Sequence, residues 1–350
     1  MDINGILSGN QIDILSDVYI VLLILSVVGS FSVLVVSILR WRNIREQVHL
    51  LVQLALADLL AALVLMSTSI MNKFQMDRSV IICQYLLPLS LTFYFISFLL
   101  VVVYAWKSKT AIQGWRERAA NDEDGQSHCR GKIVTLPVYG VVWLIPLAIY
   151  LTYVLTPLIT TAMVIPMGGI PLAQNESTYC TSCILFLHVW RDPCSKTEII
   201  HDTFIRLFLF LVVIPVMLSC SVIYYKVGKW YARHEHDRLF PVEGDGRSTR
   251  RVKKVISTAR NMVMVIIICW TPALFLILLS TLMIWTKIEQ RSLFGLYMVQ
   301  AATVSLQGFL NSMVYAWKRP NFTEAVFGEN TPLVAHNHMA FFDESLRTSA

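Results

Sequence analysis

The sequence has 350 residues, of which 55% are hydrophobic and only 15% are charged, and its mean hydropathy is +0.59. A soluble domain carries about a quarter charged residues, so this composition argues against a free cytosolic enzyme. With 15 Gly, 12 Pro and 7 Cys, the chain also fits no collagen-like, disordered or disulfide-scaffold class. The composition therefore indicates a polytopic membrane protein.

Apolar runs long enough to cross a bilayer occur seven times along the chain. A hydrocarbon core of about 30 Å needs about 20 apolar residues of helix. The sequence therefore predicts an all-α membrane protein, a seven-transmembrane helix bundle over 18–317. An N-terminal segment (1–17) precedes the bundle and a tail (318–350) follows it. The predicted spans lie near residues 18–39, 48–71, 84–106, 133–155, 204–225, 258–285 and 293–317.

The basic residues predict the orientation of this bundle. Most of the 29 Lys and Arg residues fall in loops and helix ends on one side, and such residues gather on the cytoplasmic side. We therefore expect a multi-pass protein of the plasma membrane with the N-terminus outside and the tail in the cytoplasm. The net charge of +6 then faces the anionic lipid of the bilayer, and no nucleic-acid partner is expected.

Four cysteines fall on the predicted outer side, where disulfides form: Cys83 before the third span, and Cys180, Cys183 and Cys194 in the following long loop. A bridge from Cys83 would hold the loop 156–203 over the mouth of the bundle. Cys194 is the favoured partner and Cys183 the second choice. A Cys180–Cys183 pair and free thiols are the alternatives.

The same loop carries Asn175-Glu176-Ser177, an N-glycosylation acceptor on the predicted outer side. Asn321-Phe322-Thr323 fits the same pattern but lies in the predicted cytoplasmic tail, where it stays unmodified. The sequence contains no metal-ligand cluster or nucleophile–base pair at a defined spacing, so neither a metal centre nor an enzyme activity is predicted.

Asp58 is the ionisable side chain that stands out within a predicted span. A charged group in a spanning helix costs several kcal/mol and is rare without a function. One interpretation is a protonated carboxylic acid that is hydrogen-bonded to a neighbour. The other is a site for a small cation, lined by polar groups of other spans.

Several motifs in this chain resemble those of rhodopsin-like G protein-coupled receptors. Cys269-Trp270-Thr271-Pro272 matches the sixth-span switch, and Asn311-Ser312-Met313-Val314-Tyr315 matches the seventh-span motif with Ser in place of Pro. Further matches are the Leu-Ala-x-Ala-Asp stretch that ends at Asp58, Cys83 at the start of the third span, Ser97 fourteen residues later, Trp143, Pro215, and Phe322 at the start of an amphipathic eighth helix. The resemblance covers about residues 18–327.

This resemblance implies a receptor fold and two kinds of site. Asp58, Ser97 and Asn311 would offer hard oxygen ligands, with Trp270 beside them, and oxygen ligands suit Na⁺ better than a soft metal. No other cofactor is implied. The implied switch consists of Trp270, Pro272, Asn311 and Tyr315, because proline removes a backbone donor and bends its helix. The implied ligand pocket consists of Ser90, Phe93, Tyr94, Trp270 and Tyr297.

Departures from the family pattern limit the function that is implied. Lys107-Ser108-Lys109 stands where the family has Asp/Glu-Arg-Tyr, so coupling to a heterotrimeric G protein or arrestin becomes a question for experiment. Ser90 stands where amine receptors have Asp, which argues against a biogenic amine as the extracellular ligand. The seventh span has no Lys before Lys318, which excludes a retinal Schiff base. A cytoplasmic contact is expected at Lys107, Ser108 and Lys109 and at Arg250, Arg251, Lys253 and Lys254.

More narrowly, the stretch from Gln300 to Trp317 and the tail Thr331-Pro332-Leu333 resemble the transmembrane protein 116 family of orphan multi-pass proteins. The leading hypothesis is an orphan seven-transmembrane receptor that transmits a signal across the membrane. The alternatives are a non-signalling scaffold or trafficking partner, suggested by Lys107-Ser108-Lys109, and a transporter or lipid scramblase.

Overall fold

The computed structural model describes a bundle of helices. The described residues are 7, 9–39, 48–74, 79–120, 135–161, 183–186, 206–219, 221–222, 225, 229, 246–283 and 290–314, and they contain no strand. The elements in chain order are α1 (Gly9–Leu39), α2 (Val48–Lys73), α3 (Ser79–Ala120), α4 (Thr135–Thr161), the π-helical turn η2 (Leu209–Val213), α7 (Gly246–Met283), the 3-10 turn η3 (Gln290–Leu293), α8 (Phe294–Ser305) and α9 (Gln307–Ser312).

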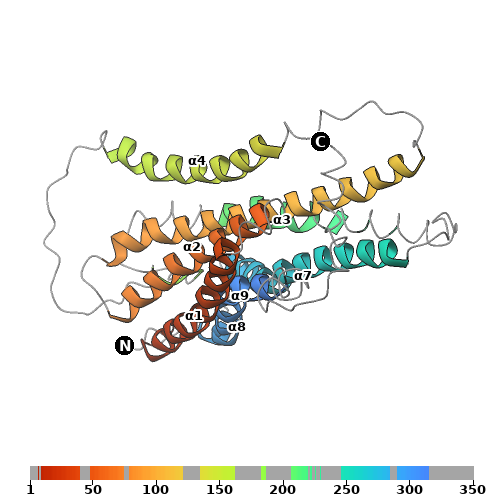
Figure 1. Ribbon diagram of the computed structural model, residues 1–350. Coiled ribbons are helices and arrows are strands. Elements are labelled where there is room, and N and C mark those ends of the chain that lie inside the picture. The colour runs from red at the N-terminus through yellow and green to blue at the C-terminus, as the bar shows by residue number, and fades with distance from the viewer. Residues whose placement is uncertain are drawn as a thin grey trace, which may run out of the picture.

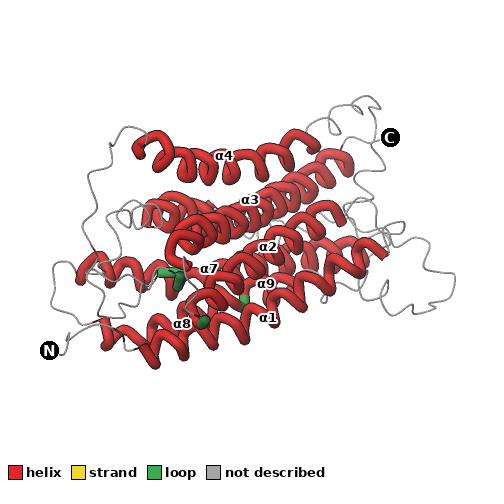
Figure 2. Tube along the Cα trace, turned by 90° about the vertical axis from the view of Figure 1, so that its left-hand side faces the viewer, coloured by secondary structure: helices red, strands yellow, loops and turns green. Residues whose placement is uncertain are grey.

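The long helices run side by side, with α4 at the edge of the bundle next to α3 (Figures 1 and 2). Within the described part, five helices are long and apolar enough to cross a membrane. They are Gly9–Leu39, Leu50–Lys73, Tyr85–Lys107, Val138–Leu155 and Arg260–Leu279. The all-helical fold and the multi-pass membrane character are therefore confirmed.

The other two predicted spans are represented by shorter helices. Arg206–Ser219 is apolar but short, and residues 290–314 are divided among η3, α8 and α9. The division between α8 and α9 has a local cause in α1. The hydroxyl of Ser26 donates to the carbonyl of Ser305 and accepts from the amide of Phe309 at 3.1 Å. In a continuous α-helix that amide would bond the same carbonyl, so Ser26 interrupts the ladder.

Several helices extend beyond the bounds predicted from apolar runs, and the largest extensions are in α1, α3 and α7. α1 begins at Gly9 and not near residue 18, α3 continues to Ala120, and α7 begins at Gly246. Parts of the two predicted inner loops are thus helical, because Ala, Gln, Arg, Glu and Lys are good helix formers although they are too polar to count as a span. The predicted eighth helix lies outside the described residues.

The bundle reverses the polarity of a soluble protein. Large apolar side chains such as Val28, Leu39 and Leu144 are exposed, whereas Ser26 and Asp58 are buried. A lipid-facing surface has this composition, since polar groups in a membrane gather at helix–helix contacts.

Candidate functional site

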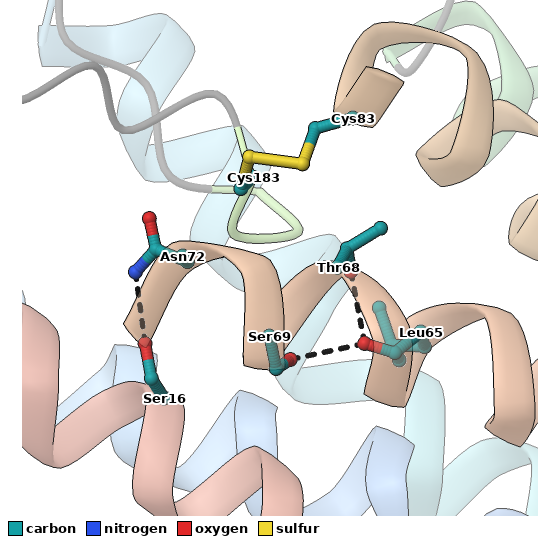
Figure 3. Close-up of a disulfide and its surroundings, with 7 residues drawn as sticks. All are labelled: Ser16, Leu65, Thr68, Ser69, Asn72, Cys83 and Cys183. Atoms are coloured by element: carbon teal, nitrogen blue, oxygen red, sulfur yellow. Dashed lines mark hydrogen bonds between the residues drawn. A yellow bond between two sulfur atoms is a disulfide. The ribbon is translucent and has the colours of Figure 1, made fainter. Parts of the chain in front are cut away.

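The disulfide at one end of the bundle joins Cys83, in α3, to Cys183 (Figure 3). Cys183 was the second choice of partner, and the preference for Cys194 is therefore wrong. Cys194 itself lies outside the described residues. Sequence spacing alone could not separate the two partners, because both lie in the same long loop.

Asp58, on α2, lies at the centre of a buried polar cluster. Its Oδ1 accepts a hydrogen bond from the Ser97 hydroxyl of α3 at 2.8 Å, and its Oδ2 accepts one from the Asn311 amide of α9 at 2.7 Å. A longer contact of 3.5 Å joins the Gln307 amide nitrogen to Oδ1. No Lys or Arg in the described part of the chain pairs with this carboxyl group, and the donors that contact it are neutral.

Gln307 links this cluster to the sixth predicted span. Its Nε2 lies 3.4 Å from the Ser97 hydroxyl oxygen, and its Oε1 accepts the indole N–H of Trp270, on α7, at 2.5 Å. A single buried side chain therefore contacts both the carboxylate site and the tryptophan.

Trp270 is fully buried among aromatic rings from two segments. Tyr94 and Phe98 of α3 pack edge-on against it, with ring centroids 5.3 and 5.1 Å away. Phe186, three residues past the disulfide, packs in the same manner at 6.3 Å. Pro272 lies inside α7 two residues on, where it removes one backbone hydrogen bond from the helix. The predicted switch residues Trp270 and Pro272 thus occupy one turn of α7.

The donor set around Asp58 fits a small hard cation. Asn311 uses its amide nitrogen for Asp58, and its buried Oδ1 has no hydrogen-bond partner among the described residues. Together with the Asp58 carboxylate and the Ser97 hydroxyl, this oxygen makes a set of the kind that Na⁺ prefers. No group of three His, Cys, Asp or Glu side chains that suits a transition metal occurs in the described ranges.

A second polar network lies between the disulfide end of the bundle and Trp270. The Tyr19 hydroxyl of α1 donates to the backbone carbonyl of Leu185 at 3.4 Å and is hydrogen-bonded to Gln300 of α8. Asn72 donates to Ser16 at 2.9 Å, as Figure 3 shows. These bonds tie α1, α2 and α8 together around the segment that the disulfide holds.

The residues predicted to line a ligand pocket occupy different surroundings. Tyr94 is buried against Trp270, and its hydroxyl lies 3.5 Å from the carbonyl of Val304. Tyr297 is also buried, and Phe93 is half-buried against the core. Ser90 is buried too, but its hydroxyl donates to the carbonyl of Ala61 in α2 at 3.1 Å. It therefore joins α3 to α2.

Of the residues predicted to form a cytoplasmic contact, Lys107 has its side chain described, and it contacts α4. The Lys107 ammonium donates to the Tyr139 hydroxyl of α4 at 2.8 Å and lies over its ring, 4.6 Å from the centroid. Ser108 and Lys109 continue α3, and Arg250, Arg251, Lys253 and Lys254 belong to α7. Asn175 and Tyr315 lie outside the described residues, so glycosylation and the end of the switch motif stay predictions.

Sequence reasoning missed Gln307, Ser26, Tyr19 and Gln300. A signal existed for Gln307, because it precedes Asn311 by four residues, and positions four apart share one face of a helix. The role of Ser26 has no sequence signal, since an isolated serine in a spanning helix normally bonds its own backbone.

The sequence from residue 13 to 331 matches the family model described as Transmembrane protein 116. The chain belongs to this family. The matched range includes the whole polar cluster, the disulfide and Trp270, so these features lie in the part of the chain that is common to the family model. Membership shows a multi-pass membrane protein, as the apolar helices do.

Proposed function

We propose that this transmembrane protein 116 family member is a receptor-like, seven-span protein in which a cation at Asp58 controls the packing of α7. The observation that carries the proposal is the continuous contact from the Asp58 carboxylate through Gln307 to the Trp270 indole. In this proposal the short helix 206–219 and the segment 290–314 are the fifth and seventh spans. The N-terminus faces outward at the plasma membrane.

The hydrogen bonds around Asp58 suggest how the two states differ. Gln307 and Asn311 now direct their amide N–H groups at the carboxylate. A cation bound to the carboxylate oxygens would repel these N–H groups. It would instead attract the amide oxygen atoms of Gln307 and Asn311. If Gln307 turns over, its bond to the Trp270 N–H is lost. A ligand shifts a conformational equilibrium by the difference between its affinities for the two states. In this proposal the ligand is the cation, and the two states differ in the orientation of the Gln307 amide.

A receptor-derived scaffold that no longer signals is the second candidate. The observation that favours it is at Lys107, where signalling members of the rhodopsin-like family have an acidic residue. The Lys107 ammonium is engaged with Tyr139 of α4. In this reading the cluster at Asp58 only stabilises the bundle, and the cytoplasmic face binds a partner other than a G protein or arrestin.

The cation site is tested by thermal unfolding of the purified chain in lipid nanodiscs, in NaCl and in choline chloride of equal ionic strength. We expect Na⁺ to raise the melting temperature of wild type and to have no such effect on Asp58→Asn. The matched control is Asp17→Asn, which alters a half-exposed carboxylate that pairs with Lys73 on the bundle surface. An equal Na⁺ effect in wild type and Asp58→Asn would contradict the cation site.

Signalling is tested separately in living cells with a panel of G protein and arrestin recruitment probes. An N-terminal tag confirms surface display of wild type and Asp58→Asn. Basal recruitment that changes in Asp58→Asn supports the receptor. Silence across the panel, with both proteins displayed, contradicts it and favours the scaffold.

A further inference from the structure

Residues 183–186 enter the interior of the bundle from the loop between α4 and the helix 206–219. Cys183, Ile184, Leu185 and Phe186 are all buried, with at most 3% of any of them exposed. The disulfide ties the segment to the start of α3 (Figure 3). A connecting segment usually runs over a surface, so three consecutive apolar side chains inside a bundle require a specific set of contacts.

Leu185 and Phe186, at the end of this segment, make specific contacts with the bundle interior. The Leu185 carbonyl accepts a hydrogen bond from the Tyr19 hydroxyl, which itself accepts one from the Gln300 amide nitrogen at 2.9 Å. The Phe186 ring packs on Trp270, the residue that the proposed function makes the lever of α7. The segment is thus contacted directly by α1 and α7, and the disulfide joins it to α3.

The backbone of Phe186 is further evidence that its position is imposed by these contacts. Its φ angle is 67°, in the left-handed region that side chains larger than Gly rarely adopt. Such a conformation persists where the surroundings determine it, and it is often found at ligand clamps and switches.

We propose that Ile184-Leu185-Phe186 is an intramolecular ligand, which occupies the binding site next to Trp270 and which an external ligand must displace. The contacts define the chemistry of that external ligand. It carries an aromatic ring for the place of Phe186 and a carbonyl-type acceptor for the Tyr19 hydroxyl. It offers an uncharged surface to Tyr19 and Trp270, because neither of these two side chains carries a charge.

The occupied site shares Trp270 with the proposed function but needs neither a cation at Asp58 nor a signalling partner. Its test is therefore independent of both. The reporter is Leu185→Cys, which keeps the backbone carbonyl that Tyr19 binds. The purified full chain in nanodiscs is treated with a water-soluble maleimide, and modification of residue 185 is followed by mass spectrometry of its peptide. Fragmentation of that peptide assigns the maleimide to residue 185 and separates it from the native Cys180 and Cys183 of the same stretch.

With Phe186 intact, we expect Leu185→Cys to react at least 100-fold more slowly than Phe74→Cys, an exposed position at the end of α2 (72%). This comparison needs no truncation in the core, so it stands even where a further variant fails to fold. Rates within threefold of each other would show that the segment is not inserted and would overturn the proposal.

Adding Phe186→Ala to the reporter is expected to accelerate its reaction at least tenfold, since the ring that anchors the segment is lost. Phe275→Ala is the matched control, because it removes a phenyl group from an exposed position of α7 (51%) and should leave the rate unchanged. Equal rates in these two variants would overturn the proposal.

Benzene provides the final test of the site as a place for an aromatic ligand. It is expected to fill the space left by Phe186→Ala and to slow the reporter reaction in that variant at least threefold, because apolar cavities bind such molecules. Benzene should not slow the reaction of the Leu185→Cys reporter in the Phe275→Ala variant. Absence of this difference would contradict a binding site for an aromatic group beside Trp270.

Discussion

Gln307 has two roles at the scale of a single residue, because its amide group donates on one side and accepts on the other. Its Oε1 accepts from Trp270, and its Nε2 faces Asp58 and Ser97. Leucine has a similar size but can form none of these bonds. Gln307→Leu therefore leaves the Trp270 N–H without an acceptor in the bundle interior, which costs about 1–3 kcal/mol.

We expect Gln307→Leu to lower the melting temperature in nanodiscs by several degrees and to uncouple Na⁺ from Trp270. The second effect appears as a Trp270-dependent fluorescence change on Na⁺ addition that is present in wild type and lost in the variant. The part of the fluorescence change that disappears in Trp270→Phe is the part that comes from Trp270. Gln53→Leu in α2 is the control, since the Gln53 amide oxygen has no partner among the described residues. Equal melting temperatures for the two leucine variants would contradict the role of Gln307.

At the scale of elements, the seventh predicted span is broken by a neighbouring helix. Its sequence has Ser312 where the rhodopsin-like motif has proline, so the usual source of a bend is absent. The Ser26 hydroxyl of α1 performs a comparable function, because it takes both the carbonyl of Ser305 and the amide of Phe309. The break lies directly before Gln307 and so determines how α9 presents its polar face to Asp58.

Ser26→Ala should allow Phe309 to bond Ser305 directly and α8 and α9 to join into one helix. The polar face of α9 then turns relative to Asp58, and we expect the Na⁺-dependent rise in melting temperature to fall by at least half. Ser67→Ala is a suitable control, since the Ser67 hydroxyl bonds only the carbonyl of Leu63 in its own helix. A full Na⁺ effect in Ser26→Ala would show that the break does not position the site.

Close packing between α9 and α1 depends on Gly308. A methyl group at this position would lie 3.0 Å from the Ser30 hydroxyl oxygen and 3.2 Å from the Ser26 Cβ. These are tighter than ordinary contacts, so the Ser26 and Ser30 side chains, or the helices that carry them, would have to shift by a few tenths of an ångström. Overpacking of this kind costs about 1–3 kcal/mol, and the gain of about 1 kcal/mol from alanine in a helix offsets only part of it in Gly308→Ala.

The control for this substitution is Gly140→Ala in α4, where no atom lies within 4 Å of the added methyl group. Alanine favours a helix over glycine by about 1 kcal/mol, so Gly140→Ala is expected to melt at or slightly above the wild-type temperature. Gly308→Ala should melt several degrees lower, measured in the same nanodiscs. If both alanine variants melt alike, α9 does not need glycine for its approach to α1.

For the whole molecule, hydropathy was sufficient to predict the helical membrane fold and the approximate position of its long helices. The limit of the method is visible in α3 and α7, which extend into stretches that hydropathy assigns to loops. An apolar run marks only the part of a helix that lies in lipid, and propensity decides where the helix ends. The break at Leu306 depends on Ser26, almost 300 residues away in the chain, and no local pattern encodes it.

The sequence predicted three of the four residues of the polar cluster, because Asp58, Ser97 and Asn311 occupy positions that a family resemblance marks. The structure brings these three side chains together. It also adds Gln307, which only its spacing from Asn311 could have suggested. The choice between Cys183 and Cys194 could not be made from spacing, because it depends on how far the loop enters the bundle.

The orientation of the whole bundle can be tested with two acceptor sites that the chain itself provides. Asn175 and Asn321 have the same Asn-x-Ser/Thr pattern, but the distribution of Lys and Arg places them on opposite sides of the membrane. Glycan transfer occurs only on the side that becomes extracellular. Each site therefore serves as the control for the other.

With the N-terminus outside, Asn175→Gln is expected to abolish the mobility shift that peptide N-glycosidase causes on a gel, and Asn321→Gln is expected to leave it unchanged. The reverse result would place the tail outside and would move the Lys107 end of α3 away from any cytoplasmic partner. Both proposed functions would then lose their basis, because receptor and scaffold alike require that end of the bundle to face the cytoplasm.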